Sequence, residues 1–352
     1  WGTFNIDNSA LILFTSGTTG TPKGVVHTFR SLLSRISLNQ IIIGSSVLNV
    51  TLCPLPTHFG HGLIGNCLTP LFNGNDLILY PGNDIKNILN LGKSIDNYGV
   101  TFLSSVPAMW KIAVKSEIPL KNSLKRIHIG SAPLSAYLWN EIIDWSGIKT
   151  VCNMYGITET ANWLAGANAN FIDPQDGLIG NMWGGDAMII DKNNKWCSFG
   201  KGELIVLTPS IMSGYYQLDN ETEKVLINGW FKTGDIGEID QNGNIIITGR
   251  RKFEINRAGL KINPEDIDLL LERNPFVLEA CAFGIPDEIA GEIVGVAIKI
   301  DEKEKLNQIK QWCGDKLVNE KVPERWFVLD EIPKNDRGKI NRDNVASICL
   351  KK

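Results

Sequence analysis

Apolar residues recur in two alternating patterns between Ala10 and Thr208. Short runs rich in Ile, Val, Leu and Phe, bounded by Gly, Pro or Asn, predict β-strands at residues 11–15, 76–80, 100–104, 126–129 and 150–154. Longer segments carry apolar residues three and four positions apart, which predicts amphipathic helices at residues 31–42, 88–98, 106–114 and 136–145. This alternation indicates a layered α/β architecture in which helices cover the faces of a sheet.

Beyond Gly185 the pattern changes to shorter strands, which we interpret as hairpins. The strand candidates are residues 187–190, 203–207, 237–239 and 245–248. Asn242-Gly243 is a strong signal for the turn between the last two. We therefore expect the large α/β domain to contain an additional β-rich segment.

A second, smaller unit is predicted after a local rise in charge at residues 249–252. Its first helix has a clear start, with Asn263 as N-cap, Pro264 in the first turn and acidic residues after it. Strands at residues 277–283 and 293–300 and a helix from about residue 306 follow. We predict a large domain at residues 1–249, a hinge at 250–252 and a small α+β C-terminal domain at 253–352.

Length and composition narrow the class of protein. A chain of 352 residues with 43% apolar and 21% charged residues is typical of a globular protein with more than one core. The formal charge of -3, without a long basic run, disfavours a nucleic-acid partner. The seven cysteines form no CxxC pair, so free thiols in the cytoplasm are expected. No apolar stretch reaches the roughly 18 residues of a membrane span, and no signal peptide is recognisable at the start.

The strongest chemical signal is the segment TSGTTGTPKG at residues 15–24, which leaves a predicted strand and leads towards a helix. Glycines allow backbone N–H groups to approach an anion, hydroxyls donate further hydrogen bonds, and a lysine supplies positive charge. Because Pro22 and Gly24 stand where a Walker A loop has Gly and Ser or Thr, a kinase- or GTPase-type loop is disfavoured. We interpret the segment as a polyphosphate cradle made by Thr15, Ser16, Gly17, Thr18, Thr19 and Lys23.

Five further motifs follow this loop in order along the chain. They are GSAPL from Gly130, YGITE from Tyr155, GWFKTGD from Gly229, Gly249-Arg250, and PKNDRGKI from Pro333. The ordered set spans nearly the whole chain and resembles the adenylate-forming superfamily, which includes acyl-CoA synthetases, peptide-synthetase adenylation domains and beetle luciferases. The resemblance implies an AMP-forming acid-thiol ligase. Such an enzyme uses ATP and Mg²⁺ to convert a carboxylic acid to an acyl-adenylate, releases pyrophosphate, and transfers the acyl group to a thiol, here CoA.

The resemblance also implies a nucleotide site. Beside the phosphate loop, its members are Gly130, Ser131, Ala132, Pro133, Tyr155, Gly156, Asp235 and Arg250. The serine, alanine and proline of GSAPL would flank the adenine, and Tyr155 would pack on its face. Asp235 would accept hydrogen bonds from the ribose hydroxyls, and Arg250 would reach the ribose or a phosphate.

Catalytic roles follow from the same motifs. Lys339 resembles the lysine that bridges the substrate carboxylate and the phosphate and stabilises the charge that builds as they react. Thr158 would touch the phosphate, and Glu159 would bind Mg²⁺, because a hard cation between phosphate oxygens needs a carboxylate oxygen. Lys252 matches the hinge position, where the family often has Asp.

The segment PLPTHFGHGL at residues 54–63 resembles the family segment whose His or aromatic residue gates the acyl pocket. The alignment slips by one residue, so either His58 or Phe59 could be the gate, and we favour His58 as a member of the catalytic set. We interpret His27 and His128 as packing or surface residues.

The substrate is expected to be a plain carboxylic acid, aliphatic or aromatic. Peptide-synthetase adenylation domains usually hold the amino group of their substrate with an acidic residue, and none is found in this region of the sequence. If the topology is that of the family, apolar walls of the pocket would come from Trp110, Trp163 and Leu164.

Two departures from the family keep alternatives open. Relatives carry an extra stretch ahead of the phosphate loop, about as large as a small domain, whereas this loop begins at Thr15. The chain is therefore expected to be a naturally short form, a fragment or one half of a split enzyme. The second departure is the segment FEINRAG at residues 253–259, where relatives commonly have an acidic residue after the hinge and a Gly-rich loop. Gly259 is retained, and a phosphopantetheine carrier protein stays open as acceptor. A non-catalytic nucleotide-binding module and a luciferase-type oxidase are the remaining alternatives.

Overall fold

The computed structural model describes residues 5–15, 22–80, 84–335 and 339–351. The chain divides into two compact units, Trp1–Thr233 with Glu238–Ile246 and Gly234–Gly237 with Ile247–Lys352. The domain and hinge boundaries expected from the sequence stay a prediction. No helix within the described ranges is long and apolar enough to cross a membrane.

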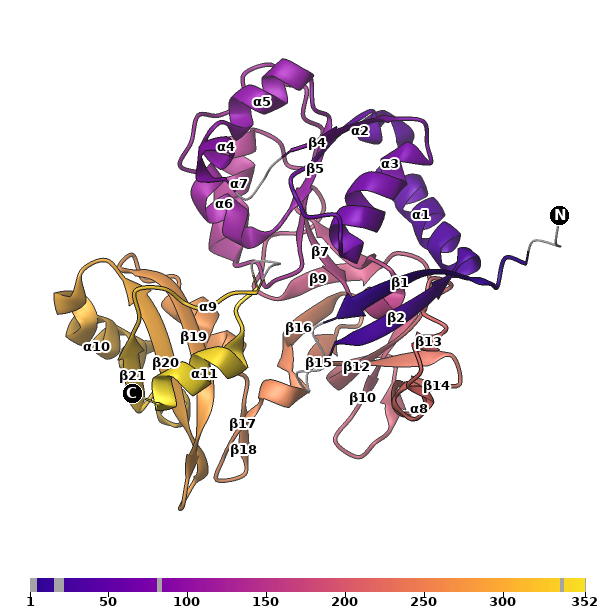
Figure 1. Ribbon diagram of the computed structural model, residues 1–352. Helices are drawn as coiled ribbons and strands as arrows, with labels where there is room; N and C mark the ends of the chain where they lie inside the picture. Colours follow the sequence, from indigo (N-terminus) through magenta and orange to yellow (C-terminus); the bar gives the residue numbers. More distant parts are fainter. Residues whose placement is uncertain (1–4, 16–21, 81–83, 336–338, 352) are drawn as a thin grey trace. The chain divides into compact units, whose positions relative to one another are not determined.

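The first unit contains most of the strands and helices (Figure 1). Its strands are β1 (Ser9–Thr15), β2 (Lys23–Thr28), β3 (Val50–Cys53), β4 (Asp76–Leu79), β5 (Phe102–Ser105), β6 (Arg126–Gly130), β7 (Val151–Gly156), β8 (Trp163–Asn168), β9 (Leu178–Met182), β10 (Asp186–Ile190), β11 (Trp196–Cys197), β12 (Gly200–Leu207), β13 (Gly214–Tyr215) and β14 (Leu226–Ile227). Its helices are α1 (Phe29–Ile43), α2 (Ser45–Leu48), α3 (Thr69–Leu71), α4 (Ile85–Leu89), α5 (Leu91–Tyr98), α6 (Pro107–Ala113), α7 (Ala136–Ser146) and α8 (Asp219–Val225), with a π-helical segment at His61–Leu68. β15 (Trp230–Ile239) and β16 (Ile245–Arg250) carry residues of both units.

A parallel sheet forms the centre of the first unit. Its strands lie in the order β4-β3-β5-β6-β7, and the antiparallel strands β8 and β9 extend it. Side chains of α4, α5, α6 and α7 pack with the strands in one large core on one face, and residues of α1 and α2 pack on the other (Figure 1). Both faces are thus buried, which is the usual condition for a parallel sheet.

A smaller sheet, β1-β2-β13, presents the phosphate-loop segment. β1 and β2 are antiparallel, with Thr15 opposite Lys23. The loop therefore leads first into a strand, and the helix expected after it begins only at Phe29, where the Thr28 hydroxyl caps it by accepting from Ser31 N. The strand β2 was not foreseen, although its two consecutive valines, which are buried here, favour a strand.

The strands predicted in the α/β part are confirmed as β1, β4, β5, β6 and β7. The helix predicted at residues 88–98 is wrong as one element, because it divides into α4 and α5 at Asn90. Asn90 adopts φ -99 and ψ 12, outside the helical region, and its side chain donates to Lys86 O at 2.7 Å. Asparagine competes for backbone groups in this way and so favours helix ends.

The β-rich segment is present beyond Gly185. β10 pairs antiparallel with both β11 and β12. In the same sheet, β15 lies next to β12, and β16 lies next to β15. The turn expected at Asn242-Gly243 is closed by Asp240, whose carboxylate accepts from the backbone N–H groups of Asn242 and Asn244.

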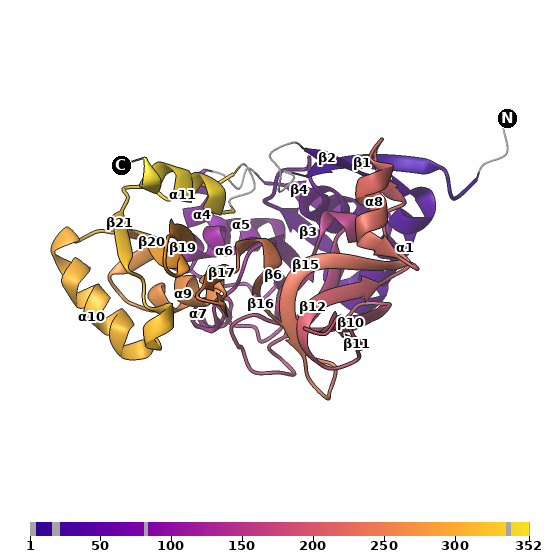
Figure 2. The same ribbon diagram turned by 90° about the horizontal axis from the view of Figure 1, so that it is seen from below.

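The second unit is a five-stranded sheet with helices on both faces (Figure 2). Its elements are β17 (Ile255–Arg257), β18 (Leu260–Ile262), α9 (Pro264–Leu271), β19 (Val277–Asp287), β20 (Gly291–Ile300), α10 (Leu306–Lys316), β21 (Arg325–Val328) and α11 (Arg342–Leu350). Along β19, Ala280 and Ala282 pack with α9 and α10, whereas Cys281 and Phe283 pack with α11. The helix start at Asn263 and Pro264 is confirmed. The predicted fold class, a layered α/β part with a β-rich segment followed by a small α+β part, is also confirmed.

Candidate active site

Two of the sequence motifs begin at the carboxyl ends of neighbouring parallel strands. Gly130 ends β6 opposite Met154 of β7, so Ser131 and Tyr155, the next residue of each segment, lie at the same edge of the parallel sheet. A side chain at Gly130 would place its Cβ 2.8 Å from Met154 O, which explains the glycine. Ser131 has a left-handed φ of 69°, a strained conformation of the kind that collects at functional sites. Ligands of open α/β sheets bind at this edge.

The phosphate-loop hairpin lies beside the YGITE motif. His27 of β2 places its Nε2 2.8 Å from Thr158 O. Four members of the predicted cradle lie outside the described residues: Ser16, Gly17, Thr18 and Thr19. Its two flanking members are described: Thr15 is half-buried, and its hydroxyl donates to Lys23 O at 3.4 Å. Through His27, β2 thus lies against the motif that holds Thr158 and Glu159.

Lys23 and Glu159 are joined through one tyrosine that the sequence analysis missed. Lys23 Nζ lies 4.9 Å from the centre of the Tyr215 ring, in a cation–π contact. The Tyr215 hydroxyl donates to Glu159 Oε1 at 2.9 Å. Burial, together with the neighbouring Glu159, raises the pKa of Tyr215 above its usual range, so the phenol keeps its proton and remains a donor. Tyr215 lies 56 residues from Glu159 along the chain, which is why no local pattern revealed it.

Glu159 suits the coordination of Mg²⁺ with a nucleotide. It is half-buried, and Met212 N donates to its backbone carbonyl at 2.8 Å, which fixes the turn that carries it. The described residues contain no group of three or more His, Cys, Asp or Glu that could hold a metal ion. Mg²⁺ is commonly bound by one or two carboxylates together with substrate phosphates, and the single carboxylate here matches that arrangement.

Lys23 is paired with Glu221 of α8 in this structure. Lys23 Nζ lies 2.9 Å from Glu221 Oε2, and Lys224 pairs with the same carboxylate. These two lysines, Lys224 first, lower the pKa of Glu221 to about 2, so it is ionised at neutral pH. A phosphate that binds Lys23 must compete with this carboxylate.

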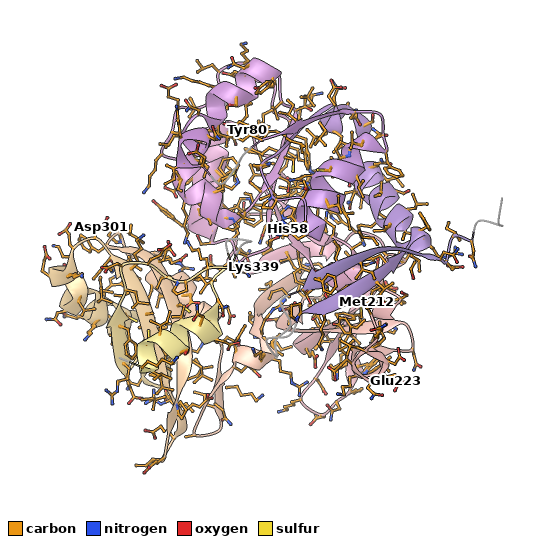
Figure 3. All side chains as sticks on the ribbon, in the orientation of Figure 1. His58, Tyr80, Met212, Glu223, Asp301 and Lys339 are labelled. Carbon is orange, nitrogen blue, oxygen red and sulfur yellow. The ribbon has the colours of Figure 1, made fainter. Side chains whose placement is uncertain are left out.

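We therefore expect Glu221→Gln to tighten ATP binding by about three-fold, the scale of an exposed ion pair. Isothermal titration calorimetry with ATP measures the effect. Glu223→Gln is the matched control, because Glu223 is exposed on the same helix (Figure 3). Equal or weaker ATP binding by Glu221→Gln would show that Glu221 does not compete for Lys23.

His27 predicts an acid-sensitive fold around this site. Burial lowers the pKa of His27 from 6.5 to about 4, although the hydrogen bond to Thr158 O opposes the shift. The unfolded chain takes up the proton below pH 6.5, whereas the folded one resists it until about pH 4. Stability is then fully present above pH 6.5 and declines as the pH falls through this window, by roughly 3 kcal/mol.

His27→Gln should flatten this decline, because an amide can donate to Thr158 O without titrating. Denaturant unfolding between pH 7 and about 4 measures it. His58→Gln, at an exposed histidine, should leave the decline as it is. An unaltered pH profile in His27→Gln would contradict this assignment.

The two histidines of the acyl-gate segment differ in burial: His58 (labelled in Figure 3) is exposed and His61 is buried. Phe59, next to His58, is buried against Cys53, Leu55 and Cys67. The sequence analysis gave no role to His61, which is buried. His61 Nδ1 lies 2.8 Å from Ser131 Oγ, and its Nε2 lies 2.7 Å from Ser104 Oγ. His61 thus links the gate segment to the GSAPL motif.

Ala132 and Pro133 follow Ser131 with partly or fully exposed side chains, and Tyr155 and Gly156 are half-buried. Leu164 and the rings of Trp110 and Trp163 are buried. Trp110 packs edge to face on Trp145 and belongs to the core beneath α6 and α7.

Asp235 and Arg250 meet in the second unit. Arg250 Nε lies 2.7 Å from Asp235 Oδ1, with Asp235 almost fully buried and Arg250 about half-exposed. A carboxylate held in place by an arginine presents acceptors of the kind that ribose hydroxyls need.

Lys252 and Lys339 also belong to the second unit; Lys339 is labelled in Figure 3. Asn335 Oδ1 accepts from Lys339 N, and Asn335 N donates to Lys339 O at 2.8 Å. Lys252 Nζ is paired with Asp343 of α11 at 2.6 Å.

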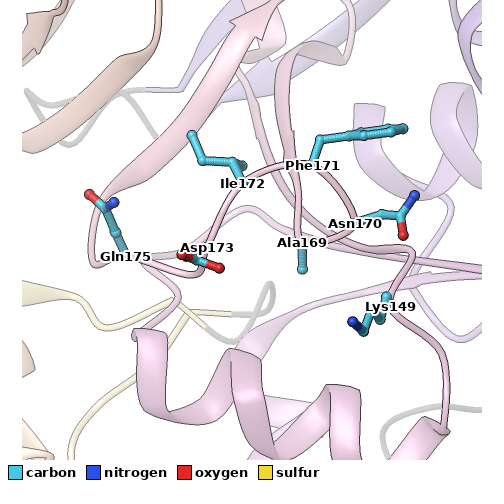
Figure 4. A pocket seen from close by; sticks show the side chains of 7 residues that line it. All are labelled: Lys149, Ala169, Asn170, Phe171, Ile172, Asp173 and Gln175. Atoms are coloured by element: carbon cyan, nitrogen blue, oxygen red, sulfur yellow. The ribbon is translucent and has the colours of Figure 1, made fainter.

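A surface pocket of about 470 Å³ lies on the loop between β8 and β9 (Figure 4). It contains none of the predicted site residues. Its lining residues are Lys149, Ala169, Asn170, Phe171, Ile172, Asp173 and Gln175.

Two family models match the chain. The AMP-binding enzyme model covers residues 3–216, and the AMP-binding enzyme C-terminal domain covers residues 266–339. The first alone covers more than half of the chain. Together they include the phosphate loop, the GSAPL and YGITE motifs and Lys339.

Individual relatives agree with the family models. The chain is 30% identical to oxalate–CoA ligase of Arabidopsis thaliana, over 98% of this chain and 68% of the relative. It is 28% identical to 2-succinylbenzoate–CoA ligase of Bacillus velezensis, over 97% of this chain and 69% of the relative. The chain thus spans about two thirds of the length of these relatives.

Solved structures share the fold. ATP-bound MatB from Rhodopseudomonas palustris has a TM-score of 0.88 at 27% identity, over 98% of this chain and 69% of that one. O-succinylbenzoate Coenzyme A synthetase (MenE) from Bacillus subtilis, in complex with ATP and magnesium ion, has a TM-score of 0.86 at 26% identity, over 97% of this chain and 70% of that one. The resemblance drawn from the ordered motifs is confirmed, and the chain belongs to the AMP-binding enzyme family.

Proposed function

We propose that this protein is an AMP-forming acid-thiol ligase that uses ATP and Mg²⁺ to activate a carboxylic acid and passes the acyl group to CoA. The observation that carries the proposal is the contact series from Lys23 through Tyr215 to Glu159, next to Thr158 and to the sheet edge that carries Ser131 and Tyr155. It joins a phosphate-binding cation, a metal-binding carboxylate and an adenine site.

The reaction has two steps. A carboxylate oxygen of the acid bonds to the α-phosphorus of ATP as the bond to pyrophosphate breaks. The thiolate sulfur of CoA then bonds to the acyl carbon, and AMP leaves with the carboxylate oxygen. When bound, Mg²⁺ supplies positive charge to phosphate oxygens.

Residues of the chain position the reactants. Lys23, with the loop residues Thr15, Ser16, Gly17, Thr18 and Thr19, binds the phosphates. Thr158 donates to a phosphate oxygen, and Glu159 holds the metal. Tyr155 with Gly130, Ser131, Ala132, Pro133 and Gly156 encloses the adenine, and Asp235 and Arg250 orient the ribose. Lys339 brings an ammonium to the reacting carboxylate and phosphate, and Lys252 serves as the hinge that allows the smaller domain to turn between the steps.

CoA is proposed as acceptor because the relatives quoted above are named as CoA ligases. A cytoplasmic site of action is part of the proposal, supported by seven cysteines that are all free thiols.

Pyrophosphate release in the presence of ATP, Mg²⁺ and a panel of carboxylic acids tests the proposal. An acid that gives pyrophosphate, AMP and a CoA thioester supports it. ATP binding without ATP–pyrophosphate exchange, over the whole panel, would instead indicate a non-catalytic nucleotide-binding protein. Thioester formation only on a phosphopantetheine carrier protein would overturn the choice of CoA.

A further inference from the structure

A cluster of buried polar side chains lies behind His61 in the first unit. It comprises His61 and Asn66 of the π-helical segment, Ser104 of β5, His128 of β6, and Asn162 and Trp163 at the start of β8. Each is at most 6% exposed. Apolar residues normally fill such a position between a sheet and a helix, so this polarity calls for an explanation.

The members of this polar cluster are in mutual contact. The Trp163 ring lies edge to face with His61 at 5.5 Å and with His128 at 4.7 Å between ring centres. Gly65 lies against the Asn162 amide and the edge of the Trp163 ring, where a Cβ would collide with both. Asn66, the next residue, donates from Nδ2 to Ser104 O at 2.9 Å. The groups thus surround one turn of the π-helical segment.

Several polar atoms of the cluster have no hydrogen-bond partner in the part of the chain that the structure describes. They are Asn66 Oδ1, Asn162 Nδ2, Trp163 Nε1 and His128 Nδ1. Each buried polar atom without a partner costs about 1–3 kcal/mol, so this set is unfavourable unless something else bonds to it.

Three of the four atoms are donors. An amide nitrogen and an indole nitrogen carry hydrogens in every state. Arg126 Nε donates to His128 Nε2 at 2.8 Å, so Nε2 is the acceptor and His128 Nδ1 carries the hydrogen. Burial keeps the pKa of His128 well below its ordinary value, so the ring is neutral. An excess of donors fits a ligand that is rich in acceptors.

The charged side chain next to the cluster is positive, which suits an anionic ligand. Arg126 is 9% exposed, donates to His128 and to Ile42 O, and lies over the Trp183 ring. Within the described part of the chain no carboxylate forms an ion pair with it. A buried cation without a counter-ion favours an anion in its surroundings. His128 lies between Arg126 and Trp163, so this preference extends to the cluster.

We propose that the cluster binds a second carboxylate of the acid, remote from the one that is activated, so that the substrate is a dicarboxylic acid. The inference rests on the proposed function, because His61 joins the cluster to Ser131 of the adenine motif. It replaces the plain acid and the apolar Trp163 wall expected from the sequence. The indole ring is buried as expected, but its N–H has no hydrogen-bond partner among the described residues.

Matched pairs of acids test the proposal on the intact chain. Pyrophosphate release is measured with succinate, glutarate and adipate, and with butanoate, pentanoate and hexanoate, which replace one carboxylate by a methyl group. We expect at least one diacid to exceed its partner in kcat/KM by about ten-fold or more, the effect of hydrogen bonds to a charged group. Equal use of both members, or a preference for the monoacids, would overturn the proposal. Absence of pyrophosphate with every acid would instead count against the proposed function.

Two substitutions test whether the preference for a diacid arises in the polar cluster. Trp163→Phe removes the indole N–H and keeps the ring, and Asn162→Leu removes the amide at similar size. Each should lower kcat/KM for the preferred diacid by about ten-fold and leave that for the monoacid nearly unchanged. Trp145→Phe is the control, because the Trp145 indole already donates to Ser116 O and lies in a different core region. Equal losses with diacid and monoacid in both cluster variants would contradict binding of a carboxylate here.

Discussion

Lys339→Ala is expected to lower acid-dependent ATP–pyrophosphate exchange by about 10²–10³-fold, the usual cost of removing one group that stabilises developing charge. The proposal gives Lys339 the ammonium that meets the carboxylate oxygen and the α-phosphate as they react. Alanine leaves that charge without its counter-ion. ATP binding, which depends on Lys23 and the adenine motif, should change little, so the loss appears in kcat rather than in the KM for ATP.

Lys334→Ala is the matched control for this substitution. Lys334 lies five residues before Lys339 and is already paired with Glu279 at 2.9 Å. Exchange activity should therefore persist in Lys334→Ala. Full exchange activity in Lys339→Ala would remove this lysine from the mechanism of adenylation.

Glu159→Gln is expected to have the second-largest effect, a fall of about 100-fold in pyrophosphate release at moderate Mg²⁺ concentration. A neutral amide is a much poorer ligand for a hard cation than a carboxylate. The half-saturating Mg²⁺ concentration should rise in parallel, which a titration with Mg²⁺ after removal of metal by a chelator would measure.

Tyr215→Phe should have a smaller effect on the Mg²⁺ requirement than Glu159→Gln. It removes only the hydrogen bond to Glu159 Oε1 and keeps the ring under Lys23. A rise of about ten-fold in the half-saturating Mg²⁺ concentration is expected. Glu117→Gln should have no effect, because Glu117 is exposed and paired with Lys93. An unchanged Mg²⁺ requirement in Glu159→Gln would contradict the metal site.

The functions of the motifs could be predicted from the sequence because each motif combines residue types that few other structures need. Glycines, hydroxyls and one lysine in a ten-residue segment indicate phosphate binding without any tertiary knowledge. The helix start at Asn263 and Pro264 was equally local, and the structure confirms it. Strands and helices with strong periodicity were predicted for the same reason.

Features that depend on distant partners could not be predicted in this way. His61 was one of two histidines in a short segment, and its partner Ser131 lies 70 residues away. Tyr215 contacts Glu159 across 56 residues. The strand β2 owes its place to pairing with β1 and β13, and the break at Asn90 to one side-chain hydrogen bond.

The polar cluster shows most clearly what could not be predicted from the sequence. In the sequence, Trp163 is a large aromatic residue in an apolar run, and an apolar pocket wall was the reasonable prediction. Only the fold reveals that its N–H, the Asn162 amide nitrogen and the His128 Nδ1 atom all lack partners among the described residues. Residue type alone does not state whether a polar atom will find its partner within the chain.

The fate of the carboxylate oxygen tests the central claim most directly. The protein is incubated with ATP, Mg²⁺, CoA and its best acid, labelled with heavy oxygen in the carboxyl groups, and the products are analysed by mass spectrometry. Acyl-adenylate formation predicts one labelled oxygen in the phosphate of AMP. Label in inorganic phosphate alongside ADP, or AMP without any label, would contradict it.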